Sequence, residues 1–133
     1  MAKYVYPAIF TPEEGGGYSV DFPDLKNCFT DADDLTNAML RANDILCMTL
    51  YDLEEAGTEI PAPSTVHEMQ SKTTQNEFVT LIACDTIEYR KFHDNRAVKK
   101  TLSIPSWLND MAERAGINFS GTLQEALKKQ LNI

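Results

Sequence analysis

The C-terminal segment, residues 98–133, limits most strongly what this chain can fold into. Residues 98–104 alternate between a mostly apolar and a fully polar face, which predicts a short strand, and Pro105 ends it. Apolar residues then recur at helical spacing in 106–115 and 122–131, with Gly116 between the two predicted helices. One strand and two short helices enclose too little apolar surface to fold alone. We therefore expect this strand to pair with the same strand of a second copy, giving an intertwined dimer.

Charge divides the chain at the same place. Residues 1–95 contain 6 Lys and Arg against 17 Asp and Glu, a net charge of −11, whereas residues 96–133 contain 6 against 3, a net charge of +3. An acidic body repels nucleic acid and favours a basic partner, while a basic tail can approach phosphates. Ordinary solvated acidity is the alternative for the first part.

The tail resembles a known DNA-binding module. Residues 99–120, KKTLSIPSWLNDMAERAGINFS, are similar to the ribbon-helix-helix repressors. The resemblance implies that two chains form an antiparallel ribbon that enters the major groove, where Lys99, Thr101 and Ser103 read base edges. It also implies that backbone amides near Ser120 and Gly121, at the start of the second helix, bind a DNA phosphate.

The chemistry of these side chains suits that role. A lysine donates hydrogen bonds to guanine O6 and N7, and the hydroxyls of Thr101 and Ser103 donate or accept at either type of base pair. The alternative is that Lys99, Thr101 and Ser103 form only the solvated face of an edge strand. We favour DNA binding because the polar face, Pro105 and the two spaced helices agree with one another.

The N-terminal part has the pattern of a mixed domain. Residues 4–10 and 18–22 are predicted strands joined by a glycine-rich hairpin loop, 12–17, and residues 27–30 are a short third strand. A helix should begin among the acids 31–34 and end at Gly57. Residues 65–76 lack a clear pattern, and the apolar run 77–84 predicts an interior strand. The expected order is β-β-β-α-β.

The predicted helix carries more apolar surface than one sheet contact requires. Its stripe from Leu35 to Leu53 has steps of three and four, while Cys47, Met48 and Tyr51 fall outside it. The excess favours a second contact surface, so Met48 and Tyr51 are candidate partner contacts.

Together the two parts resemble the HicB-type antitoxins. The resemblance rests on residues 21–31, DFPDLKNCFTD, on the helix that follows and on the ribbon-helix-helix tail. It implies an α+β fold, with a partial, degraded RNase H-like domain in residues 1–85, a linker in 86–96 and the DNA-binding domain in 97–133. It further implies a HicA-type mRNA-cleaving toxin as partner, operator DNA as ligand and a homodimer, with tetramer formation left open.

The residues do not support catalysis. An RNase H-like nuclease needs a carboxylate on its first strand, and residues 4–10 contain none. We expect Asp21, Asp24 and the acids 31–34 to cap a helix and form turns, and we expect no metal or cofactor. His67 and His93 are isolated, and the three cysteines lie in apolar segments as expected of buried thiols.

These observations predict a cytoplasmic antitoxin that neutralises its toxin and represses its own operon. There is no apolar run long enough for a membrane span and no secretory signal pattern. The alternative is a ribbon-helix-helix repressor whose N-terminal domain senses a small molecule, although no residue pattern marks a ligand pocket. A metal-dependent nuclease is a third, weaker possibility.

Overall fold

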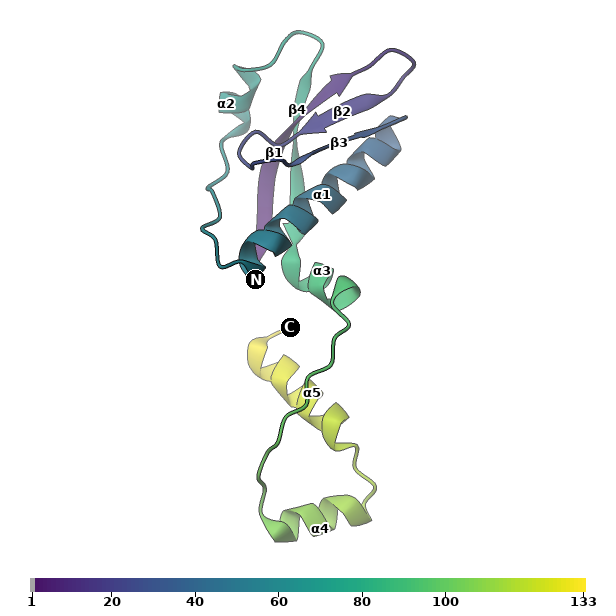
Figure 1. Cartoon of the computed structure of the whole chain (residues 1–133), viewed down its shortest axis with the longest axis vertical. Coiled ribbons are helices and arrows are strands. Elements are labelled where there is room, and N and C mark those ends of the chain that lie inside the picture. Colours follow the sequence, from purple (N-terminus) through teal and green to yellow (C-terminus); the bar gives the residue numbers. More distant parts are fainter. Residues whose placement is uncertain (1) are drawn as a thin grey trace. The chain divides into compact units, whose positions relative to one another are not determined.

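The computed structural model describes residues 2–133, and the chain divides after Arg96 into two compact units. Figure 1 shows the elements of both units. The first contains β1 (Lys3–Pro12), β2 (Tyr18–Asp21), β3 (Phe29–Ala32), α1 (Leu35–Glu55), α2 (Val66–Gln70), β4 (Phe78–Asp85) and α3 (Thr86–His93). The second contains α4 (Ser106–Arg114) and α5 (Phe119–Leu131). The predicted β-β-β-α-β order is confirmed, with α2 and α3 added.

The first unit is built on a four-stranded antiparallel sheet in the order β3-β2-β1-β4. β1 is the central long strand, and Ile9 lies opposite Val79 on one side and Asp21 on the other. The prediction that residues 77–84 form an interior strand is wrong, because β4 is an edge strand. Its run of apolar residues is divided between two faces, and Leu81 is 52% exposed on the face away from the core.

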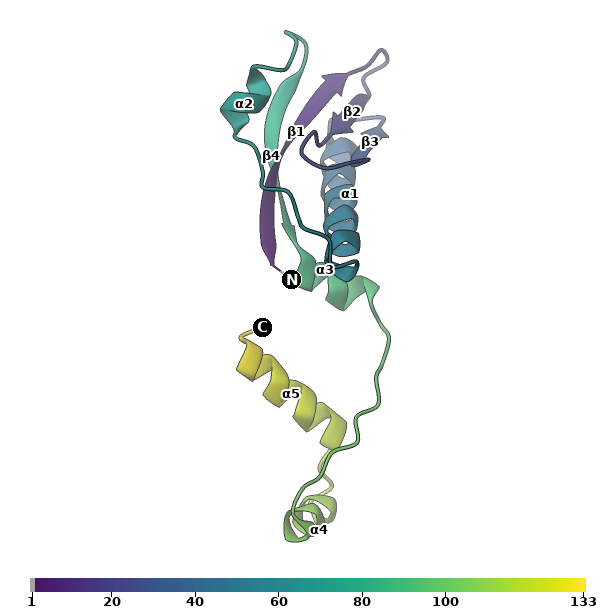
Figure 2. The same ribbon diagram turned by 60° about the vertical axis from the view of Figure 1, so that its left-hand side comes forward.

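The core lies between one face of the sheet and α1. Alternate residues of β1, Tyr6, Ala8 and Phe10, are buried in a single cluster with Leu46 and Leu50 of α1. Figure 2 shows α1 on one side of the sheet and α2 on the other, where α2 packs against β4 and β1. Each face of the sheet therefore carries one helix, the long α1 on the core side and the short α2 on the other.

Local signals in the sequence account for both ends of α1. Asp34 caps the helix, since its Oδ1 accepts a hydrogen bond of 2.7 Å from the Asn37 amide. The chain leaves the helix through Gly57, whose φ of +65° is unfavourable for residues with a Cβ. Between these ends the apolar stripe faces the sheet, so this helix is the element that the sequence predicted best. Cys28, Cys47 and Cys84 are buried free thiols, as expected.

Helix α3 is held on α1 by an ionic cluster. The Arg90 guanidinium donates to Glu54 at 3.0 Å and to Glu55, and the Glu54 carboxylate also accepts from the Tyr4 hydroxyl at 2.9 Å and the Thr86 hydroxyl at 3.0 Å. Residues 86–93, the start of the expected linker 86–96, therefore form a helix that packs on α1 within the first unit.

The second unit is two helices preceded by a segment without regular structure. Residues 94–105 form neither helix nor strand in the single chain, so the strand predicted from residue 98 is not paired here. α4 ends before Gly116 as predicted, whereas α5 begins at Phe119, three residues earlier than expected. Across the residues that the structure describes, no helix combines the length and apolar character that crossing a bilayer requires.

Candidate functional site

The predicted base-reading residues lie in the segment that precedes α4. Lys99, Thr101 and Ser103 are all exposed. The apolar residues that alternate with them are exposed too, and Val98 and Leu102 have exposed fractions of 81% and 62%. An extended segment with one polar and one mostly apolar face is what a strand would present before it pairs.

Both helices of the second unit leave their apolar faces uncovered. No side chain of α4 or α5 is buried, and the exposed fraction reaches 63% at Met111 and 65% at Leu131. Both residues belong to the apolar residues that recur at helical spacing in the two predicted helices. Folded soluble domains rarely leave this much contiguous apolar surface in water, so the second unit requires a covering surface.

The start of α5 is shaped by its cap. Asn118 is the N-cap, and its Oδ1 accepts a hydrogen bond of 3.1 Å from the Gly121 amide. A Cβ at position 121 would lie 2.9 Å from Asn118 Nδ2, so Gly121 leaves room for this cap. The Gly121 amide is thus already bound within the chain, and Ser120 lies in the first turn of the helix.

A shallow groove lies between α1 and α3, and we call it the α1–α3 groove. Its volume is about 300 Å³, and Met48, 44% exposed, is one of its lining residues. Tyr51 is half-buried instead. Its ring centroid lies 5.5 Å from that of Tyr89, and the Arg90 guanidinium carbon lies 4.6 Å from the centroid of the Tyr51 ring. Of the two candidate partner contacts, Met48 is therefore the accessible one.

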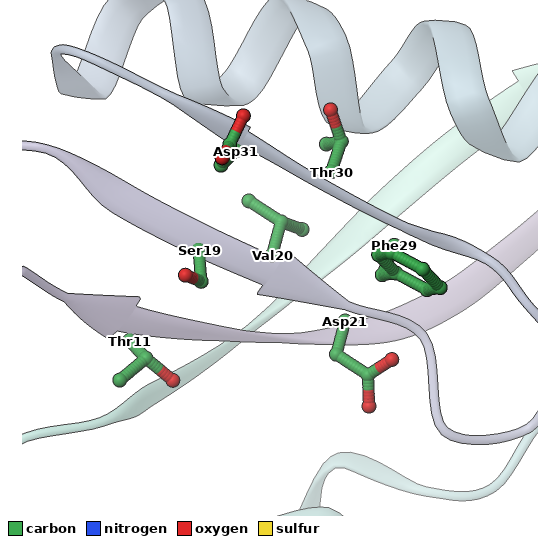
Figure 3. A pocket seen from close by; sticks show the side chains of 7 residues that line it. All are labelled: Thr11, Ser19, Val20, Asp21, Phe29, Thr30 and Asp31. Atoms are coloured by element: carbon green, nitrogen blue, oxygen red, sulfur yellow. The ribbon is translucent and has the colours of Figure 1, made fainter.

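The structure also shows a surface that our sequence interpretation missed. A hollow of about 310 Å³ lies over β1, β2 and β3 (Figure 3). We call the outward-facing part of its lining the β2–β3 face, formed by Thr11, Ser19, Asp21, Phe29 and Asp31. The alternation of apolar and polar residues in these strands was visible, but it does not reveal which side of the sheet stays open.

A second hollow of about 270 Å³ adjoins the first and shares Asp31 with it. The hairpin loop contributes Glu13 and Glu14 to this lining, and Asp33 and Arg41 complete its charged groups. Arg41 donates to the carbonyl oxygen of Asp31 at 2.9 Å rather than to a carboxylate. The two hollows are neighbours through Asp31, and acids outnumber basic residues in their described linings.

The electrostatics of this region follow from its partial burial. Among the described residues, no Lys or Arg forms an ion pair with Asp21 or Asp31. Burial raises the pKa of Asp21, although a hydrogen bond from the Phe22 amide works in the opposite direction. A cation brought near Asp21 would stabilise its ionised form.

The acids of the first unit serve structural roles at several positions. The Asp24 carboxylate accepts hydrogen bonds from the Ser64 amide at 2.8 Å and the Ser64 hydroxyl at 2.6 Å, while Asp34 caps α1. Over residues 2–133 there is no group of three or more His, Cys, Asp and Glu arranged to hold a metal ion.

Comparison with known proteins identifies the family. A family model described as "HicB_like antitoxin of bacterial toxin-antitoxin system" matches residues 6–127. The chain belongs to this HicB-like antitoxin family. The predicted family and the α+β fold class are confirmed.

Individual relatives of this HicB-like antitoxin include proteins from phage and bacteria. An uncharacterised 14.9 kDa protein from the rep-hol intergenic region of Haemophilus phage HP1 (strain HP1c1) is 26% identical over 105 residues, 78% of this chain and 75% of the relative. A chain from a toxin-antitoxin complex from Streptococcus pneumoniae is 26% identical with a TM-score of 0.58, covering 96% of this chain and 99% of that one. A chain from a HicA3 and HicB3 toxin-antitoxin complex is 17% identical with a TM-score of 0.51, covering 62% and 99%.

Proposed function

We propose that this HicB-like antitoxin is a cytoplasmic protein that neutralises a HicA-type toxin with its first unit and binds operator DNA with its second. It acts by binding and not by catalysis. One observation supports the two-part proposal most strongly. In the second unit neither helix buries a side chain, and the segment before α4 is exposed, with one polar and one mostly apolar face.

In this proposal a second copy of the chain covers the exposed apolar faces of α4 and α5. Two segments around residues 98–104 pair as an antiparallel ribbon, and the helices of both chains bury their apolar faces against each other. The ribbon then presents Lys99, Thr101 and Ser103 to the major groove, as in the ribbon-helix-helix module that the tail resembles. The first turn of α5, at Ser120 and Gly121, approaches a phosphate.

Charge supports a division of labour between the units. A HicA-type toxin binds RNA and needs a basic surface for it, so the acidic first unit attracts the toxin and competes with RNA phosphates. The tail is basic and approaches DNA. The related chain from Streptococcus pneumoniae comes from a toxin-antitoxin complex, which supports a protein partner of this kind.

Co-expression with the neighbouring reading frame tests the proposal. We expect a small basic protein to copurify at fixed stoichiometry, and the complex to bind DNA from the promoter of its operon. If the chain purifies without a protein partner and releases promoter DNA on addition of a small molecule, the protein is instead a ligand-responsive repressor. Metal-dependent RNA or DNA cleavage by the purified chain would contradict the non-catalytic assignment.

A further inference from the structure

Within residues 2–96, no helix packs on β2 and β3 on the side of the sheet that faces away from α1. On that side α2 packs against β4 and β1. The outward side chains of β2 and β3 are set by the register, which pairs Ser19 with Asp31 and Asp21 with Phe29. The β2–β3 face is therefore an unpartnered sheet surface with a hollow in it (Figure 3).

This face combines an apolar anchor with open carboxylates. Phe29 is 64% exposed, although its neighbours in the chain, Cys28 and Thr30, are buried and half-buried. Aromatic side chains are enriched at the centres of protein interfaces, and carboxylates around them add electrostatic complementarity to a basic partner. Phe29 is not part of the buried core cluster, so core packing does not explain its position.

The charge of the region is strongly one-sided. The two hollows are lined by five acids, and in the described part of the chain none of them forms an ion pair: Glu13, Glu14, Asp21, Asp31 and Asp33. Arg41 is the one Lys or Arg among their described lining residues. Such a surface complements a basic partner and repels nucleic acid.

We propose that the β2–β3 face is the surface on which this antitoxin docks its basic toxin partner. Phe29 packs against an apolar part of the toxin, and Asp21 and Asp31 accept hydrogen bonds from its Arg or Lys side chains. This inference rests on the proposed function and adds to it the location of the inhibitory surface.

A stable protein interface buries roughly 800 Å² on each side. A toxin docked on the β2–β3 face would therefore also contact residues around the second hollow, including Glu13 and Glu14 of the hairpin loop. The α1–α3 groove around Met48 is the competing surface. It is lined by one acid, Asp44, alongside Arg41, and so is less complementary to a cationic protein.

Matched variants of the full chain separate the two surfaces. Asp31→Arg and Phe29→Ser alter the β2–β3 face, while Asp44→Arg and Met48→Ser make the same kinds of change at the α1–α3 groove. All four side chains are exposed, so folding is preserved, which circular dichroism and retained promoter DNA binding would verify. The measurement is the affinity of each variant for the copurified basic protein at two salt concentrations.

We expect both β2–β3 variants to lose on the order of 30-fold in affinity or more, as a central interface residue does. Asp31→Arg should also weaken the salt dependence, and the α1–α3 variants should stay within about threefold of the parent chain. If the β2–β3 variants bind the basic protein as tightly as the parent chain does, the β2–β3 face is not the docking surface, although the proposed function still holds. Failure of the parent chain to bind any basic protein overturns the proposed function and this inference with it.

Discussion

Replacing Glu54 with Gln removes the carboxylate that joins α1 to β1 and α3. The side chain is 6% exposed, and it accepts hydrogen bonds from Tyr4, Thr86 and Arg90. Burial raises the pKa of Glu54, but the hydrogen bonds to its carboxylate, from the chain's amino group and from Arg90, Tyr4 and Thr86, outweigh it and lower the pKa from 4.5 to about 2. Burial, together with the hydrogen bond to Glu54, raises the pKa of the Tyr4 hydroxyl to about 12.

The expected loss of stability follows from that pKa. A difference of this size corresponds to roughly 3 kcal/mol between the ionised and neutral forms. Water at Arg90, whose side chain is 16% exposed, screens the interaction and reduces the expected loss to about 2 kcal/mol. Because the folded-state pKa is depressed, the contribution is complete above pH 4.5 and is lost as the pH falls toward 2. The variant should therefore differ most from the parent chain at neutral pH.

Urea unfolding followed by tyrosine near-ultraviolet circular dichroism measures this loss. All five tyrosines lie in residues 1–96, and the one tryptophan, Trp107, lies in the second unit. With Trp107 replaced by Phe in the parent chain and in both variants, the tyrosine signal reports on the first unit. Glu55→Gln is the matched control, because Glu55 also contacts Arg90 but is 46% exposed, and it should cost less than about 1 kcal/mol. Equal losses for the two variants at pH 7, or a loss for Glu54→Gln that persists undiminished at pH 2.5, would refute the reasoning.

Three further predictions concern the proposed function and the caps. Lys99→Ala and Thr101→Ala should each weaken promoter binding in a gel-shift assay by about 1–3 kcal/mol, the cost of a lost base contact, while toxin binding is unchanged; full promoter affinity would contradict the ribbon assignment. A chain ending at Asp94 should still rescue cells from the toxin and should run as a smaller species in light scattering, and failure to rescue growth would show that the tail is part of the inhibitory surface. Asp34→Ala should lower the free energy of unfolding by about 1 kcal/mol through loss of the α1 cap, and an unchanged urea midpoint would show that the cap is redundant.

The sequence predicted the elements whose signals are local. α1 has a continuous apolar stripe, an acidic cap and a terminal glycine, so its position could be derived without tertiary information. We predicted that α5 begins three residues too late, because we assigned Phe119 to the connection between the two helices. The signal for the true start is Asn118, which caps the helix. The short helix α2 was missed because five residues do not show a helical period; its signal is the capping box formed by Thr65 and Glu68.

Tertiary arrangement accounts for what the sequence did not predict. The apolar run of β4 is compatible with an interior strand, and only its pairing with β1 alone shows that Leu81 lies at an edge. The β2–β3 face depends in the same way on where α2 packs. Period-two patterns specify that two faces differ, but not which neighbouring element covers each one.

The two free edges of the sheet show how this fold directs its partners. At the β3 edge, Arg41 donates to the Asp31 carbonyl at 2.9 Å, and at the β4 edge Asn43 donates to the Ala83 carbonyl at 2.6 Å. Both donors come from α1, and each engages a backbone acceptor that an added strand could use. Edge pairing by the first unit is thereby disfavoured at these two positions. No regular element packs on residues 98–104 in the described second unit, so this segment offers open backbone groups for the strand pairing that we propose between two copies.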